Sequence, residues 1–407
     1  MATYDVYIEA DATASDGVVT GSGTEVDPYV GRGDDVWKYV IDNVLTTWGA
    51  GVGGNPAWAL GDRHVVHASN KEAYLWYDTV NDNLTFPSAW TAADQSNRFF
   101  DIKCWETTSR EASGTFQQWP DGTWRACVEF DGQNVANAPL YTLTTSPVRY
   151  YDCYHHSFTR GTYQNTYGTN QRCIVEGMSN MSENSQAKYA GCWIKGNVDS
   201  SDWGLYLPRS AERCLFEGQM LYYILPNSYC VIRNSIFKMD SSVERAVYLN
   251  TNCDFTTIEG CIFIGSGVAD QHAIESSNYS GATTLTIRNN LFINFNGSGS
   301  HPITERSDLG SNSAGAFAEV DGNFYWNCNA NDVQEETNAV TLTKNPLINP
   351  RGYDFRLIED PQLQPLFRYL STSPFVSFAP WGVVNTNVSD IRGGSLVDLS
   401  RISEVGS

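Results

Sequence analysis

The sequence predicts an all-β fold, a solenoid in which short parallel strands stack one turn above another. Three observations predict it: a five-residue phrase recurs seven times, successive copies are 16 to 33 residues apart, and apolar or small residues fall two apart within the phrase. A constant phrase with variable filler is typical of a solenoid, whose insertions are confined to loops, and a period of two indicates a strand. The copies span residues 173–177, 192–196, 214–218, 230–234, 256–260, 285–289 and 318–322.

Each copy ends on Gly or Asn, and the last four continue alike, with one small or polar residue and then two apolar residues. Gly and Asn tolerate positive φ and can turn the chain out of a strand. A degenerate copy at residues 153–157 is predicted to start the series. Each turn is therefore expected to have a strand followed by a sharp corner.

The residue before each anchor is charged, and its sign alternates along the series. If the copies stack in register, counterparts on neighbouring turns lie about 4.8 Å apart, where opposite charges stabilise a sheet and like charges do not. These side chains are predicted to form one surface ladder rather than catalytic acids. The column consists of Glu176, Lys195, Glu217, Arg233, Glu259, Arg288 and Asp321.

Ten cysteines are present, and half of them begin a copy of the phrase. Thiols stacked on the inner face of a solenoid behave as small core residues, and distance alone does not exclude a disulfide between neighbours. No Cys/His spacing is typical of zinc, so we predict neither a metal site nor a cofactor. His155 takes an inward position and is predicted to be a hydrogen-bonded core residue. The predicted inward column is Cys153, Cys173, Cys192, Cys214 and Cys230.

The termini differ from the repeats. Residues 1–33 are predicted to hold an N-terminal strand, at 3–10, and the segment that leads into the solenoid of residues 34–380. Asp34 is suited to N-cap a helix over residues 34–47 whose apolar residues share one face. Such a helix can cover the open first turn, whose strand edge would otherwise recruit other chains. Residues 381–407 are polar and are predicted to be an extended C-terminal arm.

These phrases resemble the right-handed parallel β-helix of the pectate-lyase-like superfamily, and this chain is most like the β-helix proteins of bacteriophage virions. The resemblance covers about residues 20–380 and implies a single-stranded right-handed helix. Members include secreted polysaccharide lyases and hydrolases as well as tailspikes and other virion proteins. Because one fold hosts many functions, the resemblance alone does not select among them.

Charge and composition limit the classes of partner that the sequence allows. The formal net charge of −20 argues against nucleic acid, since little would neutralise phosphates. No apolar run is long enough to span a membrane, and the opening residues do not form a secretory signal. Eight of the twelve tryptophans precede residue 130 and are predicted mainly to fill the core.

Acidic residues in the long loops are the candidates for catalysis. Pectate-type lyases hold calcium in a compact Asp cluster, which the sequence lacks. Glycoside hydrolases use two carboxylates about 5–9.5 Å apart across an open groove. The candidates for such a pair, with His272 and His301 nearby in sequence, are Asp240, Glu244, Asp270, Glu275, Glu305 and Asp308.

Two functions are carried forward. The first is a non-enzymatic phage virion protein, a capsid decoration or a spike or fibre component, located in the virion after synthesis in the host cytoplasm, contacting other virion proteins and assembling as a homotrimer. The alternative is a carbohydrate-active enzyme, a tailspike depolymerase, polysaccharide lyase or glycoside hydrolase with a glycan partner. Convergence of the candidate carboxylates in an open groove favours the enzyme; its absence favours the virion protein.

Overall fold

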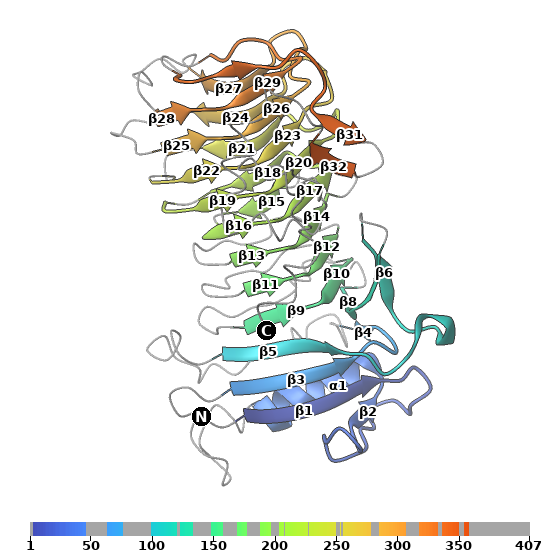
Figure 1. Ribbon diagram of the computed structural model, residues 1–407. Helices are drawn as coiled ribbons and strands as arrows, with labels where there is room; N and C mark the ends of the chain where they lie inside the picture. The colour runs from blue at the N-terminus through green and yellow to red at the C-terminus, as the bar shows by residue number, and fades with distance from the viewer. Residues whose placement is uncertain are drawn as a thin grey trace, which may run out of the picture. The chain divides into compact units, whose positions relative to one another are not determined.

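A computed structural model of the chain has mostly parallel strands in long stacked sheets (Figure 1). The chain divides into two compact units, the first formed by residues 1–118 and 124–210 and the second by residues 119–123 and 211–407. The structure describes residues 3–45, 63–75, 99–119, 123–132, 148–157, 169–176, 188–196, 203–206, 208–226, 228–249, 253, 255–277, 285–306, 317–332, 336–349 and 354–357. The predicted C-terminal arm at 381–407 lies outside these residues.

Two parallel sheets form most of the first unit. The first has the order β2 (Tyr29–Gly31), β1 (Thr3–Ala10), β3 (Arg63–Ser69), β5 (Phe99–Trp105), β9 (Val148–Tyr151), β11 (Thr169–Gln171) and β13 (Lys188–Ala190). The second has the order β4 (Tyr74–Leu75), β8 (Val128–Asp131), β10 (Cys153–His156), β12 (Ile174–Glu176) and β14 (Trp193–Lys195). The unit also holds the 3-10 helix η3 (Arg110–Ala112), the antiparallel pair β6 (Phe116–Gln118) and β7 (Trp124–Ala126), and β15 (Trp203–Tyr206).

Three parallel sheets form most of the second unit. The first is β19 (Val231–Arg233), β22 (Thr257–Glu259), β25 (Leu285–Arg288) and β28 (Phe317–Asp321); the second is β17 (Leu215–Gly218), β20 (Ile236–Met239), β23 (Ile262–Ile264), β26 (Leu291–Ile293), β29 (Phe324–Trp326) and β30 (Val340–Thr341). The third is β18 (Tyr222–Leu225), β21 (Arg245–Leu249), β24 (His272–Ser277) and β27 (His301–Arg306), and an antiparallel pair joins β31 (Leu347–Asn349) to β32 (Asp354–Leu357). β16 (Ser210–Glu212) spans the chain boundary between the units.

The repeated phrase occupies two different sheets, which corrects the prediction of one column. The first three copies contribute β12, β14 and β17, whereas the last four contribute β19, β22, β25 and β28. In the second unit one turn therefore carries the phrase on one sheet and its continuation, such as Ser235 to Phe237, on the next. The short 16-residue step is the distance between two sheets rather than between two turns.

Pairs of opposite charge do stack, but in separate columns. Glu176 pairs with Lys195, at 3.1 Å between Oε2 and Nζ. Glu217 pairs with Lys238, at 3.4 Å, and not with Arg233 as predicted. The ladder is thus made of local pairs along each sheet.

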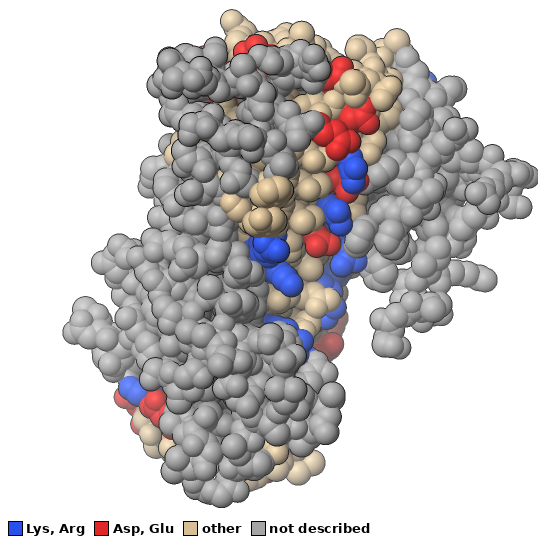
Figure 2. Space-filling view, turned by 90° about the vertical axis from the view of Figure 1, so that its left-hand side faces the viewer, with Lys and Arg blue, Asp and Glu red and all other residues tan. Residues whose placement is uncertain are grey.

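A second column in the second unit keeps the predicted alternation. Arg233, Glu259, Arg288 and Asp321 occupy matching positions on four successive strands. The Glu259 carboxylate lies between the two arginines: it accepts a hydrogen bond from Arg288 Nε at 2.8 Å and forms an ion pair with Arg233 Nε at 3.1 Å. Figure 2 shows Lys and Arg side chains interleaved with Asp and Glu in a band on the described surface.

The anchors of the last four copies confirm the predicted corners. Asn234, Gly260, Asn289 and Gly322 all have positive φ, between 49° and 65°. In this region glycine is unstrained and Asn is the best tolerated substitute. Gly and Asn therefore suit the backbone conformation at these four anchors.

The thiol column is confirmed only for some of its members. Cys153, Cys173 and Cys192 are buried at equivalent positions of the first unit. Cys230 does not belong with Cys214, because it lies one residue before β19 on another sheet. In the second unit the column that contains Cys214 continues through Ser235, Cys261, Asn290 and Asn323.

This column joins turns through side-chain hydrogen bonds. The Asn290 side chain accepts a hydrogen bond from the backbone amide of Cys261 at 2.9 Å and donates one to the Ile258 carbonyl at 3.0 Å. The backbone amide of Asn290 donates to Asn323 Oδ1 at 3.0 Å. Ser235 has the same role on the preceding turn, where its hydroxyl accepts a bond from the Cys214 amide. Short polar side chains in the core thus satisfy backbone groups at the corners.

Replacing Asn290 with Leu is expected to destabilise the protein by about 2–4 kcal/mol, because two buried backbone groups lose partners at about 1–3 kcal/mol each. Asn290→Ser should cost less, since a serine fills the same column at Ser235. Urea unfolding followed by circular dichroism measures both. Asn296→Leu is the control, because its side-chain bond to Asn327 is exposed; equal losses at Asn290 and Asn296 would contradict the expectation.

The N-terminal helix differs from the predicted one. α1 spans Gly33–Tyr39 and continues as the π-helix η1 (Val40–Leu45). Arg32 occupies the N-cap position without a side-chain cap, and Asp34 lies inside the first turn, so the predicted role of Asp34 is wrong. Trp37 is fully buried and packs edge-on against Phe130 at 5.4 Å.

Tryptophan burial follows the prediction at some positions only: Trp119 is also buried, whereas Trp124 is 43% exposed. Within the described ranges, none of the helices has the length and apolar character needed to cross a membrane.

Candidate functional site

The third sheet of the second unit brings together several of the predicted residues. The strand register aligns Arg245 with His272 and His272 with His301. The two histidine rings stack, with centroids 5.9 Å apart and planes at 1°. Glu275 lies on the same sheet, paired in register with Tyr248.

Arg245 links two of the candidate carboxylates. Its Nε lies 2.6 Å from Glu275 Oε2, and its Nη1 lies 2.6 Å from Glu244 Oε2. The Glu275 side chain is 1% exposed and that of Glu244 is 57% exposed. The two carboxylates therefore share one guanidinium: Glu275 contacts it on its buried side and Glu244 on its solvent-exposed side.

Burial and charge set the protonation of this group. Burial alone would lower the pKa of Arg245, but the charge and hydrogen bond of Glu275 raise that pKa above its ordinary value. Burial lowers the pKa of His272, and the charge of Glu275 opposes that shift. His272 Nε2 lies 3.9 Å from Glu275 Oε2, too far for a hydrogen bond. At neutral pH we therefore expect a charged Arg245 beside a neutral His272.

Aromatic rings flank the guanidinium. Tyr222 and Tyr248 stack with centroids 4.7 Å apart. The Arg245 guanidinium carbon lies 5.8 Å from the Tyr222 ring and 5.4 Å from the Tyr248 ring. Cation–π attraction at these distances adds to the ion pairs and holds the arginine in place.

The other candidates do not join this cluster. Asp240 is bonded to Ser241 and Ser242 in its own turn, with 3.1 Å from its Oδ1 to the Ser242 amide. Asp270 is exposed and occupies a corner with a φ of 55°. Glu305 is paired in register with Ser276, but its side chain lies outside the described residues, as does all of Asp308.

Chemically, the arrangement is an ion-paired cluster in which one guanidinium lies between two carboxylates. A glycosidase acid must be able to give up a proton to substrate, whereas Glu275 is buried and pinned by a guanidinium. Glu244 is accessible but is bound to the same cation. Sequence reasoning identified the carboxylates and both histidines but missed Arg245 and the tyrosines. The adjacency of Glu244 and Arg245 was visible, but their relation to Glu275 depends on the 27-residue turn that stacks Arg245 on His272.

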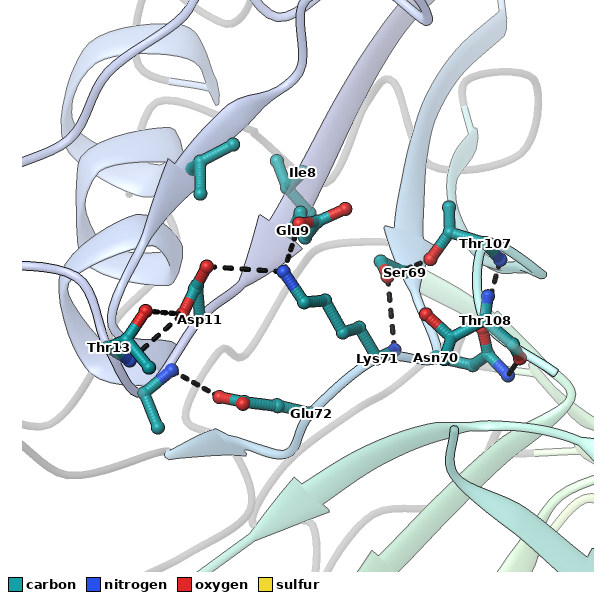
Figure 3. Close-up of polar contacts among 12 residues, drawn as sticks. Ile8, Glu9, Asp11, Thr13, Ser69, Asn70, Lys71, Glu72, Thr107 and Thr108 are labelled. Atoms are coloured by element: carbon teal, nitrogen blue, oxygen red, sulfur yellow. Dashed lines mark hydrogen bonds and ion pairs between the residues drawn. The ribbon is translucent and has the colours of Figure 1, made fainter. Parts of the chain in front are cut away.

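A second polar cluster lies in the first unit, where the end of β1 meets the segment after β3 (Figure 3). Lys71 Nζ lies 2.7 Å from Glu9 Oε1 and 3.1 Å from Asp11 Oδ2. The Asn70 side chain accepts from the Thr107 and Thr108 amides. Each group has its partner within the cluster, so its evident role is to fasten the two segments together.

The Asp11 carboxylate gives a pH-dependent prediction. Hydrogen bonds from Thr13, and then Lys71, lower the pKa of Asp11 to about 2. A depressed carboxylate pKa contributes stability above the unfolded pKa of about 3.9 that is lost as pH falls toward 2. Thr13→Val should raise the Asp11 pKa, measured by carbon-13 NMR titration of the carboxyl. Asp11→Asn removes the titration and serves as the control; an unchanged Asp11 pKa in Thr13→Val would contradict the assignment.

Two exposed aromatic residues form a further surface feature. Tyr229 and Phe255 are 53% and 47% exposed and stack at 4.7 Å between ring centroids. Both occupy corners with positive φ, just before β19 and β22. Exposed ring faces of this kind can stack on sugars or enter a subunit interface.

Comparison with known proteins adds no relative: no protein-family model, no curated protein and no solved structure matches this chain.

Proposed function

We propose that this chain is a non-enzymatic phage virion protein, a capsid decoration or a spike or fibre component, built on a right-handed parallel β-helix of the pectate-lyase-like type with α1 as its N-terminal cap. The observation that carries the proposal is the state of Glu275, which is buried and neutralised by Arg245 rather than open to a substrate. In this role the protein contacts other capsid or tail proteins and assembles as a homotrimer.

The contacts that repeat from turn to turn favour a structural role. Opposite charges, stacked rings and core amides each repeat along the sheets, so every turn supports the next. Solenoid stability of this kind suits a protein whose task is to hold a surface in place. The band of charge in Figure 2 holds acidic as well as basic side chains, and the net charge of the chain is −20, which favours a protein partner over nucleic acid.

The alternative is a carbohydrate-active enzyme, and two observations favour it. The exposed Tyr229–Phe255 stack is of a kind that contacts sugar rings. Glu244 and Glu275 also approach one another through Arg245, beside His272. A depolymerase would need one of these carboxylates to be released from the guanidinium when substrate binds.

Three measurements separate the two functions. Antibody labelling of purified particles from the source phage, viewed by electron microscopy, should place the chain on the capsid or tail. Light scattering after size exclusion should give three times the monomer mass. Incubation with bacterial surface polysaccharides should release no reducing ends. Cleavage that is lost in both Glu275→Gln and Glu244→Gln would replace the virion proposal with the enzyme.

A further inference from the structure

Beyond the proposed function, we propose that Cys153, His155 and Cys173 form a buried binding site for a thiophilic metal ion, Zn²⁺ or Cu⁺. The two Sγ atoms and an imidazole nitrogen all lie within 4.8 Å of one another, and all three residues are buried. The cluster lies wholly within the first unit.

The backbone produces this grouping directly. Cys153 and His155 are two residues apart on β10, so their side chains point to the same face. Cys173 comes just before β12, and the pairing of Tyr154 with Ile174 sets Cys173 beside Cys153 on the next turn. The in-register pairing of two strands thus brings together three metal-ligand atoms, a grouping that the spacing of the residues in the sequence does not show.

His155 lacks the hydrogen bonds predicted for a core histidine. Within the part of the chain that the structure describes, neither of its ring nitrogens has a partner, although the ring is fully buried. The ring stacks on Phe130 at 5.4 Å and meets Tyr150 edge-on at 5.0 Å. Buried polar atoms without partners are rare and require an explanation such as an ion.

Tyr150 adds a second polar group of the same kind. Its buried hydroxyl also has no partner among the described residues. The Tyr150 ring meets the His155 ring edge-on, and the Tyr150 carbonyl accepts a hydrogen bond from the Cys173 thiol at 3.5 Å. Tyr150 is therefore the candidate for a fourth position, occupied by its oxygen or by a water molecule bound to it.

The donor set suits a soft cation. Cysteine sulfur selects zinc and Cu⁺, and imidazole suits zinc and copper. Two thiolates bound to one zinc ion lie at most about 4.6 Å apart, twice the bond length of about 2.3 Å. The cluster can therefore close by small side-chain movements.

Charge balance favours binding in the core. Each thiol now donates a hydrogen bond to a carbonyl oxygen, Cys153 to Tyr151 at 3.4 Å and Cys173 to Tyr150 at 3.5 Å. Binding of Zn²⁺ releases both thiol protons to solvent, and the two thiolates then neutralise the dication while His155 stays neutral. With Zn²⁺, no net charge is left in the apolar interior, whereas with Cu⁺ the site keeps one negative charge.

The test measures metal retention by the full chain. Protein loaded with Zn²⁺, or anaerobically with Cu⁺, and passed through a desalting column is expected to retain about one ion per chain by mass spectrometry. X-ray absorption at the metal edge should show two sulfur neighbours, and retention against a chelator shows which of the two ions the site binds more tightly. Retention of neither ion by the wild type would overturn the proposal.

Matched variants guard against unspecific thiol binding. His155→Phe and Cys173→Ala should each weaken metal affinity more than tenfold, while Cys261→Ala, which removes a buried thiol elsewhere, should not. Phenylalanine suits the His155 site because Phe130 holds the equivalent position on the preceding strand. Without metal, His155→Phe should raise the melting temperature by removing two unsatisfied nitrogens. Equal loss of metal in Cys261→Ala would also overturn the site.

Discussion

Replacing Phe263 with Ala is expected to lower the free energy of unfolding by about 3–5 kcal/mol, the usual range for removing a core aromatic ring. Phe263 is fully buried and stacked on both sides, 4.6 Å from Phe237 and 5.1 Å from Phe292. The stack continues through Phe216 and Tyr325 at each end. Loss of a middle ring leaves a cavity that the neighbours cannot fill, since their backbones are held in register.

Urea unfolding followed by both fluorescence and circular dichroism measures this effect. Phe255→Ala is the matched control, because Phe255 also stacks on an aromatic ring but is 47% exposed. We expect that control to cost less than about 1 kcal/mol. A loss at Phe263 no larger than that at Phe255 would show that the ring stack does not hold the turns together.

The sequence predicts the stacked parallel strands well because their determinants are local. Period-two apolar residues and the Gly or Asn that ends the phrase are visible in a single copy, and the positive φ of Asn234 and Gly260 follows from them. The assignment of each copy to a sheet is not local. Glu217 and Arg233 match in the phrase, yet only long-range pairing shows that Glu217 faces Lys238 instead.

The candidate site shows the same limit. Glu244, His272 and Glu275 were selected because long loops carry many functional residues. A carboxylate can be a catalyst or part of an ion pair, and this depends on whether a basic residue of the preceding turn lies beside it. Because turn length in a solenoid varies, the sequence does not show which residue that is. Arg245 reaches Glu275 only because 27 residues separate it from its stacking partner His272.

The thiol cluster illustrates a third case. An inward file containing Cys153 and Cys173 could be predicted from the phrase, as could the inward position of His155. The absence of hydrogen-bond partners for the His155 ring, within the described residues, is a property of the packed core. No sequence pattern predicts this lack of partners, because it depends on how the surrounding side chains pack around the ring.

The buried ion pair gives the second large effect. Glu275→Gln is expected to destabilise the protein by about 3 kcal/mol, because it leaves the guanidinium of Arg245, only 13% exposed, without its buried counter-charge. The amide keeps the shape of the carboxylate, so the loss reports charge rather than packing. Thermal and urea unfolding at neutral pH measure the effect.

Glu244→Gln is the control built into the same guanidinium, since Glu244 meets Arg245 at the same 2.6 Å but is 57% exposed. An exposed pair contributes about 0–1 kcal/mol, so the two variants should differ several-fold although both remove one negative charge from Arg245. The double variant Arg245→Met with Glu275→Leu should recover much of the loss, because apolar groups can replace a buried ion pair at little cost. Equal effects of the two glutamine variants would mean that solvent screens both carboxylates alike, and Glu275 would then be accessible enough to serve as a catalytic acid.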